Sequence, residues 1–334
     1  ATGDEFLTAF ILGIEAECRI GNAVYPDHYD RGYHITATAG AFGAAVAVGR
    51  LLGLDAEQMT WALGISATQS SGLREVFGTM TKSFNPGRAA QNGLTAAFLA
   101  KSGFDSSRHG LEGVRGFANV LSDRQDYGEI VDDLGGRWEA KLNSYKPFAC
   151  GIVIHPTIDA CQQLRRELGA KVGSIASVSI DAHPLTLELT GKREPSTGLE
   201  TKFSIFHSAA VALLRGDGSP TAFTDEAAND PALVALRRKV DVRVDPACHE
   251  AAATVTLTLA DGSTVVRHVE RAIGSRERPL TDDDLVEKFR NQSNPVLGSA
   301  RVDRLLDLAW SVGSLDSVAR LCQLAQAERA AELA

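Results

Sequence analysis

The chain of 334 residues is 44% hydrophobic and 23% charged, an ordinary globular balance, and at about 150 residues per domain its length predicts two domains. Its net charge of −8 argues against nucleic-acid binding, so an anionic substrate would need a local cluster of cations. No apolar run reaches the ~18 residues of a membrane span, and five scattered cysteines without a CxxC pair argue against a disulfide framework or a zinc site and favour the cytoplasm.

The first residues, ATGDEFLTAFILGIEAECRI, already follow a helical rhythm. Phe6, Leu7, Phe10, Ile11 and Ile14 recur at the spacing of one helix face, which predicts a helix over 5–20 with that face buried. The chain lacks an initiator methionine and starts inside this pattern, so we expect it to be a fragment.

A Gly- and Ala-rich helix, ITATAGAFGAAVAVGRLLGL, is predicted after a polar loop that ends at His34. The positive end of a helix dipole lowers the pKa of a neighbouring imidazole and favours its neutral form. His34 is therefore a candidate base, although an exposed or backbone-bonded histidine would have the same sequence context. Asp55 and Gln58 then predict a capping box on the next helix.

The stretch FGTMTKSFNPGRAAQNGLTAAFL, at 77–99, predicts a polar loop followed by an Ala-rich helix that begins after Pro86 and Gly87. Lys82 and Arg88 would lie in this loop beside the free N–H groups of the helix start, an arrangement that suits a small carboxylate. The alternative is an exposed helix connection with ordinary surface charges.

The pattern changes near residue 145, where Lys146 precedes a proline and His155 and Pro156 start a helix that Gly169 ends. Period-two alternation in SVSIDAH, VDVRVDP and ATVTLTLADGSTVVRHV predicts strands confined to about 174–270, with a hairpin turn at Asp261. Between these strands lies a helical pattern, and the chain is predicted to be helical again from LTDDDLVEKFR to its end, with helix starts at Thr281 and Asp303.

The helical pattern between the strands, GLETKFSIFHSAAVALLRGDG, places Lys202 and His207 near a helix start, where either residue could contact substrate or be solvated. The sequence contains no GxGxxG, GxxxxGK[ST], GxSxG or HExxH motif, so nucleotide-binding, serine-hydrolase and zinc-protease functions lose their usual support. Lysines and histidines at element starts instead suit proton transfer beside a carboxylate, where cations stabilise the enolate-like charge.

Several stretches resemble the MmgE/PrpD family, which includes 2-methylcitrate dehydratase, cis-aconitate decarboxylase and iminodisuccinate epimerase. They are SATQSSGLREVFGTMTKSFNPGRAAQNGLTAAFLA, SYKPFACGIVIHPTIDA, HPLTLELTGKREPSTGLETKFSIFH and the closing helices. The resemblance covers nearly the whole chain. It implies a mainly α protein with a large all-helical domain and a smaller α+β lid domain, a homodimer, and metal-independent chemistry on small polycarboxylates without a cofactor.

The resemblance also implies the domain order. Residues 1–144 would be the N-terminal part of the helical domain, 145–274 the lid domain, and 275–334 the helices that return to the helical domain. Family members have a further N-terminal helical region with an Asp-rich, His-containing active-site loop. That region has no counterpart before Ala1, and its absence would leave the site incomplete.

By the same resemblance, His34, Lys82 and Lys146 match active-site positions of the decarboxylase. A tyrosine of the decarboxylase is replaced here by His207, and one of its histidines falls on Gly151. Both departures weaken an assignment to cis-aconitate decarboxylation.

The leading prediction is therefore a hydro-lyase that removes the proton α to a carboxylate and expels hydroxide from a 2-methylcitrate-like hydroxy acid. The predicted catalytic residues are His34 as base, Lys82, and His207 as the acid for the leaving hydroxyl; the predicted substrate-binding residues are Arg88, Lys146, His155 and Lys202. Repulsion among the lysines would depress the pKa of one of them. The alternatives, in order, are an epimerase or isomerase, a cis-aconitate-type decarboxylase, and a non-catalytic carboxylate-binding protein.

Overall fold

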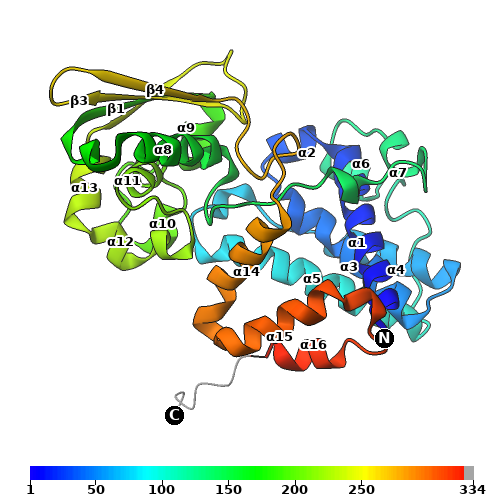
Figure 1. Ribbon diagram of the computed structural model, residues 1–334. Helices are drawn as coiled ribbons and strands as arrows, with labels where there is room; N and C mark the ends of the chain where they lie inside the picture. The colour runs from blue at the N-terminus through cyan, green and yellow to red at the C-terminus, as the bar shows by residue number, and fades with distance from the viewer. Residues whose placement is uncertain (327–334) are drawn as a thin grey trace, which may run out of the picture. The chain divides into compact units, whose positions relative to one another are not determined.

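The computed structural model describes residues 1–326, which divide into two compact units. Residues 1–143 and 303–326 form a helical unit, and residues 144–302 form a unit that combines helices with one four-stranded sheet (Figure 1). The predicted mainly α architecture with an α+β part is therefore confirmed. The chain passes from the α+β unit back to the helical unit within α15 (Ser299–Trp310). Helix α14 (Asp282–Leu297) therefore belongs to the α+β unit, whereas the sequence predicted that the helical domain resumes at residue 275.

Helix α3 (Ile35–Leu52) is the centre of the helical unit, and it contacts α1 (Gly3–Val24), α4 (Ala56–Gln69) and α5 (Met80–Lys101). Small residues permit this packing: a Cβ added at Gly93 would lie 2.4 Å from the Ala41 carbonyl oxygen. Among the described helices, α3 alone is long and apolar enough to cross a membrane. Half of that stretch is buried inside the protein, as expected for the core helix of a globular unit.

The predicted first helix is confirmed as α1, but its predicted buried face is wrong. Phe10 and Ile11 are 55% and 39% exposed, and the side facing the protein carries small residues and the buried Glu15–Arg19 pair. A Cβ added at Gly13 would lie 2.9 Å from the Gly43 carbonyl oxygen of α3. Because the two backbones approach this closely, Phe10 and Ile11 lie on the other side of α1, while Phe6, Leu7 and Ile14 are half-buried.

The predicted capping box at Asp55 and the predicted helix start at Thr281 are confirmed. Asp55 and Gln58 form a capping box on α4, and Thr281 and Asp284 form another on α14. The predicted helix start at Asp303 is wrong, since α15 begins at Ser299. The predicted helix over the last residues, 327–334, lies outside the described part of the chain.

Short elements complete the helical unit. They are α2 (Asp27–Asp30), the 3-10 helices η1 (Arg74–Val76), η2 (Glu139–Leu142) and η6 (Val312–Ser314), and the helices α6 (Phe117–Leu121), α7 (Gly128–Val131) and α16 (Ala319–Leu324). The closing segment contacts the start of the chain: the Gly3 N–H donates to the Leu315 carbonyl at 2.7 Å.

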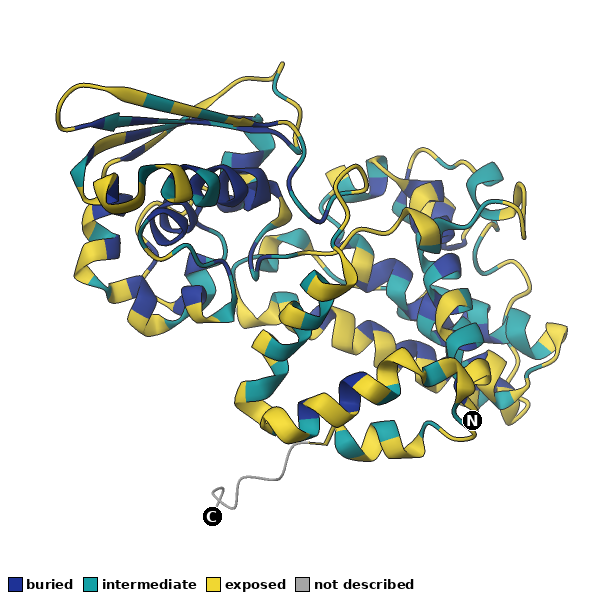
Figure 2. Ribbon diagram, in the orientation of Figure 1, coloured by how far each residue is buried: buried dark blue, intermediate teal, exposed yellow. Residues whose placement is uncertain are grey.

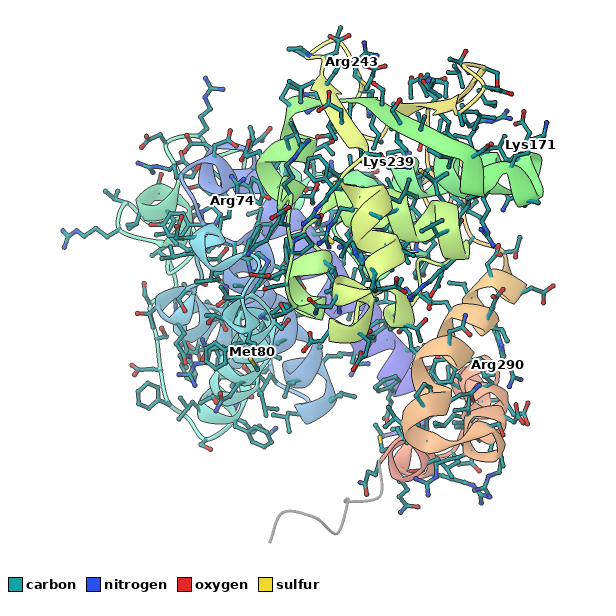
Figure 3. The ribbon with its side chains drawn as sticks, turned by 90° about the vertical axis from the view of Figure 1, so that its left-hand side faces the viewer. Arg74, Met80, Lys171, Lys239, Arg243 and Arg290 are labelled. Atoms are coloured by element: carbon teal, nitrogen blue, oxygen red, sulfur yellow. The ribbon has the colours of Figure 1, made fainter. Side chains whose placement is uncertain are left out.

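The sheet of the α+β unit has the strand order β2-β1-β3-β4. Its strands are β1 (Ile175–Ala182), β2 (Val240–Val244), β3 (Ala253–Leu259) and β4 (Thr264–Val269), and all lie within the predicted range. Strands β3 and β4 form the predicted antiparallel hairpin, with Gly262 at φ +84°, while β1 and β2 are parallel. In Figure 3 Lys239 and Arg243 mark the β2 region; Lys239 donates to the Ile175 carbonyl at 2.8 Å, and Arg243 pairs with Asp181.

Helices pack beside this sheet and form the core of the α+β unit. Helix α8 (His155–Leu168) contacts β3 and β4, and α11 (Ile205–Arg215) contacts α8 and β2. All residues of α11 from Ile205 to Leu213 are buried (Figure 2). The remaining elements are η3 (Ile152–Ile154), η4 (Gly169–Ser174), α9 (Pro184–Thr190), α10 (Gly198–Thr201), η5 (Pro220–Phe223), α12 (Asp225–Asn229) and α13 (Pro231–Arg237).

Candidate active site

His34 lies at the start of α3, as predicted, and its ring is buried. The backbone N–H of His34 donates to the Gly72 carbonyl at 3.0 Å, and this bond ties the segment before α3 to the segment after α4. Gly72 has φ +137°, and a Cβ there would lie 2.5 Å from the Ala37 side chain, so this junction requires glycine. The backbone therefore holds His34 in a fixed position.

Burial, and then the charge of Lys82, lower the pKa of His34 to about 4. The predicted direction is correct, but the main cause is burial rather than the helix dipole. At neutral pH the imidazole is uncharged, the form that can take a proton.

Asn85, on α5, sets the orientation of this imidazole. Its side-chain amide lies 3.3 Å from Nδ1 of His34, and the residue is buried. The amide atom facing Nδ1 is the nitrogen Nδ2, which donates to an unprotonated Nδ1 and leaves the proton on Nε2. Turning the amide by 180° would let its oxygen accept from a protonated Nδ1, and a base that accepts at Nε2 requires this second arrangement.

Lys82 is half-buried in the first turn of α5, one turn before Asn85. The ring of Phe77 lies next to both functional side chains: Nζ of Lys82 is 5.8 Å from its centroid, and the His34 ring meets it edge-on at 5.0 Å. Neutral imidazole, ammonium and aromatic ring thus form one group in the helical unit, which we call the His34 group.

The predicted loop around Lys82 and Arg88 is wrong. Helix α5 begins at Met80, so both cations are helical and Pro86 lies inside the helix rather than at its start. Residues six positions apart on a helix point to different sides. Arg88 is exposed and donates to Gln91 at 2.9 Å, so it does not join the His34 group.

A second group of cationic residues lies in the α+β unit. His155 begins α8, as predicted, and is 3% exposed. Burial, then Lys146, lower its pKa to about 3, with a smaller contribution from Lys288. Burial also lowers the pKa of Lys288, followed by the charge of Lys146. The charges of Lys146 and Lys288 thus act on His155 within one unit, and we call these three residues the Lys146 group.

Lys202 joins this group through Cys150. Burial raises the pKa of the Cys150 thiol to about 12, and Lys146 and Lys202 both act against that rise. The Gly151 N–H donates to the Lys202 carbonyl at 3.1 Å, which holds α10 against the segment before α8. Within residues 1–326, Lys146, Lys202 and Lys288 form no ion pair with a carboxylate, so their charge is available to an anion.

The proposed role of His207 does not fit its position. Its side chain is 0% exposed, and Nε2 donates to the Ala222 carbonyl at 2.9 Å inside the core of the α+β unit. Burial lowers its pKa. A residue so enclosed has no access to a leaving hydroxyl, so we withdraw it as the catalytic acid.

The buried His155 predicts that the protein loses stability in acid. The unfolded chain takes up a proton near pH 6.5, whereas native His155 does not until about pH 3, so lowering the pH favours unfolding. Between pH 7 and pH 5 this residue should contribute a loss of about 2 kcal/mol. The free energy of unfolding in urea, measured at pH 7 and at pH 5, should fall by about 2 kcal/mol less in His155→Gln than in the wild type. The exposed His109→Gln should lose as much stability as the wild type. Equal losses in His155→Gln and the wild type would contradict the assignment.

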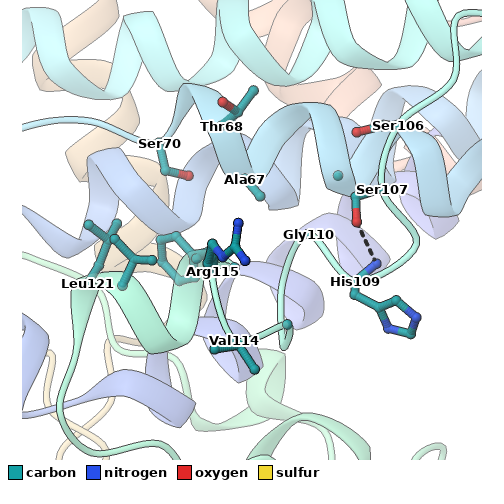
Figure 4. Close-up of a pocket in the computed structure, with 15 residues that line it drawn as sticks. Ala67, Thr68, Ser70, Ser106, Ser107, His109, Gly110, Val114, Arg115 and Leu121 are labelled. Carbon is teal, nitrogen blue, oxygen red and sulfur yellow. Dashed lines mark hydrogen bonds between the residues drawn. The ribbon is translucent and has the colours of Figure 1, made fainter.

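A hollow of about 830 Å³ lies elsewhere in the helical unit, between the end of α4 and the loop that follows α5 (Figure 4). Ser70, Ser107 and Arg115 line it, and His109 at its edge pairs with Glu112 at 2.7 Å. None of the predicted site residues lines this hollow, so the chemistry has to be sought at the His34 and Lys146 groups.

The two family models cover most of the chain. MmgE/PrpD N-terminal domain matches residues 1–130, and MmgE/PrpD C-terminal domain matches residues 148–312. The chain belongs to the MmgE/PrpD family. The resemblance seen in the motifs is thereby confirmed.

Curated MmgE/PrpD relatives are lyases of two kinds. The cis-aconitate decarboxylase of Aspergillus terreus is 29% identical over 97% of this chain and 71% of that enzyme. The human cis-aconitate decarboxylase is 25% identical over 100% of the chain and 71% of the enzyme. The 2-methylcitrate dehydratase of Cupriavidus necator is 32% identical over 40% of the chain and 31% of the enzyme. These relatives support a lyase.

Sequence reasoning missed one residue of each candidate group. Phe77 begins the stretch at 77–99 but carries no charge to mark it, and Lys288 lies in a polar helix where any lysine is expected on the surface. Among the described residues, no three His, Cys, Asp or Glu side chains are grouped to hold a metal ion. The independence from a cofactor stays a prediction.

Proposed function

We propose that this chain is a lyase that acts on a small polycarboxylate by removing a proton next to a carboxylate, and that its reaction is the dehydration of a 2-methylcitrate-like hydroxy acid. The observation that carries the proposal is the buried, neutral His34 beside the ammonium of Lys82. A neutral imidazole can take the proton, and a cation close to it can hold the carboxylate and the negative charge that develops.

In this reaction the C–H bond breaks, its proton passes to Nε2 of His34, and its electrons form a C=C bond as the C–O bond to the hydroxyl breaks. A base with a pKa of about 4 is weak, so Lys82 must stabilise the enolate-like charge strongly. The imidazolium formed is in turn a strong acid. It can return the proton to the departing hydroxide as water, which removes the need for His207.

The α+β unit supports the same substrate class. Lys146, Lys202 and Lys288 have no carboxylate partners among the described residues and share one neighbourhood. We propose that they bind carboxylates of the substrate. Arg88 is not part of this proposal, because it bonds along the surface of α5.

Decarboxylation of cis-aconitate is the second candidate. The relatives that match nearly the whole chain carry that name, whereas the named dehydratase matches 40% of it. The replacements at Gly151 and His207 count against this candidate.

Product analysis separates these reactions. The protein is incubated in D₂O with 2-methylcitrate and, separately, with cis-aconitate, and the products are followed by NMR and CO₂ release. The proposal expects a conjugated C=C product from 2-methylcitrate without CO₂. Release of CO₂ from cis-aconitate would establish the second candidate instead. Deuterium at the α-carbon without a new C=C would indicate an epimerase, and thermal stabilisation by ligand without turnover would indicate a binding protein.

A homodimer and a cytoplasmic location complete the proposal. Both rest on the family resemblance and on the scattered cysteines rather than on a feature of the fold. Sedimentation equilibrium should give the mass of two chains, and a monomer mass at micromolar concentration would reject the dimer.

A further inference from the structure

A buried carboxylate, Asp159, connects two parts of the α+β unit. It lies one turn after His155 on α8 and is 5% exposed. Its Oδ2 accepts from the Ile273 N–H at 3.2 Å and from Arg278 at 2.8 Å, and its Oδ1 accepts from Gln163 at 2.8 Å. Since a buried carboxylate is costly unless it is bonded on all sides, this site is built around its charge.

The segment 271–278 that Asp159 holds is itself closed into a tight loop. Arg278 donates to the Arg271 carbonyl at 2.7 Å, and the Gly274 N–H donates to the Arg278 carbonyl at 2.7 Å. Arg278 therefore bonds both to α8 and to the loop that it closes. Loss of the carboxylate would release the segment from the helix.

The same segment holds the backbone beside Lys146. The Tyr145 N–H donates to the Gly274 carbonyl at 3.1 Å. A Cβ on Gly274, which has φ +87°, would lie 2.3 Å from the Tyr145 carbonyl oxygen, so the backbone segments at Gly274 and Tyr145 are in close contact. A continuous path of hydrogen bonds thus runs from the first turns of α8 through Asp159 and Gly274 to the residue before Lys146.

We infer that Asp159 is a positioning residue: by clamping segment 271–278 to α8, its carboxylate fixes where Lys146 stands relative to His155. Asp159 itself touches no substrate. The inference deepens the proposed function, since it rests on Lys146 as a carboxylate-binding residue, and it gives Asp159 and Arg278 a part in substrate affinity.

The test compares Asp159→Asn and Arg278→Met with the wild type by two measurements. The first is hydrogen exchange of the Tyr145 amide, which reports the clamp without any substrate. The second is the Kd of tricarballylate, an inert tricarboxylate, together with KM and kcat on the substrate that is turned over. We expect exchange at Tyr145 to rise about tenfold and Kd and KM to rise about tenfold, with kcat nearly unchanged. The double variant should be no worse than either single variant, because both break one clamp.

Glu15→Gln is the matched control. It also removes the charge of a buried ion pair, Glu15 with Arg19 at 2.6 Å, but in the helical unit. It should lower the thermal midpoint and leave Tyr145 exchange, Kd and KM unchanged. Because Arg278 is partly exposed, Arg278→Met should disturb the core less than Asp159→Asn. The clamp can therefore still be tested with Arg278→Met if Asp159→Asn does not fold.

Unchanged exchange at Tyr145 in both variants would overturn the inference. The inference would also be overturned if Glu15→Gln, at a loss of thermal stability equal to that of the clamp variants, raised Kd and KM by as much as they do. If the wild type neither binds tricarballylate nor turns over a polycarboxylate, the proposed function fails, while exchange at Tyr145 still decides whether the clamp exists.

Discussion

Replacing His34 by glutamine is expected to lower kcat by about 10²–10⁴-fold, because the variant keeps a polar side chain of similar size but loses the group that takes the proton. The measurement is steady-state turnover of the substrate identified by product analysis. Thermal unfolding of the variant, run in parallel, shows whether the fold is retained.

His109→Gln is the control for this experiment. It is also a histidine of the helical unit, but it is exposed and pairs with Glu112 on the surface. We expect wild-type turnover from it. A His34→Gln variant that folds and keeps full activity would remove His34 from the mechanism and with it the proposed proton abstraction.

Replacing Lys82 by methionine is expected to lower kcat/KM by about 10²–10³-fold, since it removes the charge that stabilises the developing anion. The pH profile should also change. In the wild type, kcat/KM should fall as the pH drops through about 4, where His34 becomes protonated and can no longer accept a proton. Because Lys82 helps to lower the pKa of His34, this acidic limb should move to higher pH in Lys82→Met.

Lys101→Met, at the far end of the same helix, is the matched control and should leave both the rate and the acidic limb in place. A rate loss in Lys82→Met without any movement of the limb would mean that Lys82 binds substrate but does not act on His34. No rate loss at all would contradict the proposed function.

The features that the sequence predicted correctly are those set by local chemistry. The capping box at Asp55 needs only residues three positions apart, the helix start at Thr281 needs only its local pattern, and the hairpin at Gly262 needs only its turn and two alternating runs. The helix starts at His34 and His155 belong to the same class. Each is decided within a few residues, so a single sequence suffices.

The predictions that were wrong concern which side of a helix is buried and which distant segments pack together. Phe10 and Ile11 of α1 point outward because Gly13 and Gly43 bring two helices together, which depends on the partner helix. His207 sits at a helix start in sequence, yet α11 is enclosed by its neighbours on every side. In the His34 group, Phe77 and Asn85 contact His34 although they lie about 40–50 positions away in sequence. The periodicity of a sequence cannot predict such contacts.

The proline inside α5 has a dynamic consequence. Pro86 cannot donate the hydrogen bond that an α-helix gives to the carbonyl four residues earlier, at Lys82, and the N-cap Thr79 makes no side-chain capping bond. The turns from Met80 to Asn85 are therefore tied to the rest of α5 by fewer backbone bonds than the turns that follow, so they can open as a small unit of their own. Lys82, which the proposed function places beside the base, thus stands on a turn that lacks one backbone hydrogen bond and a side-chain cap, so it should adjust to a substrate more readily than the later turns of α5.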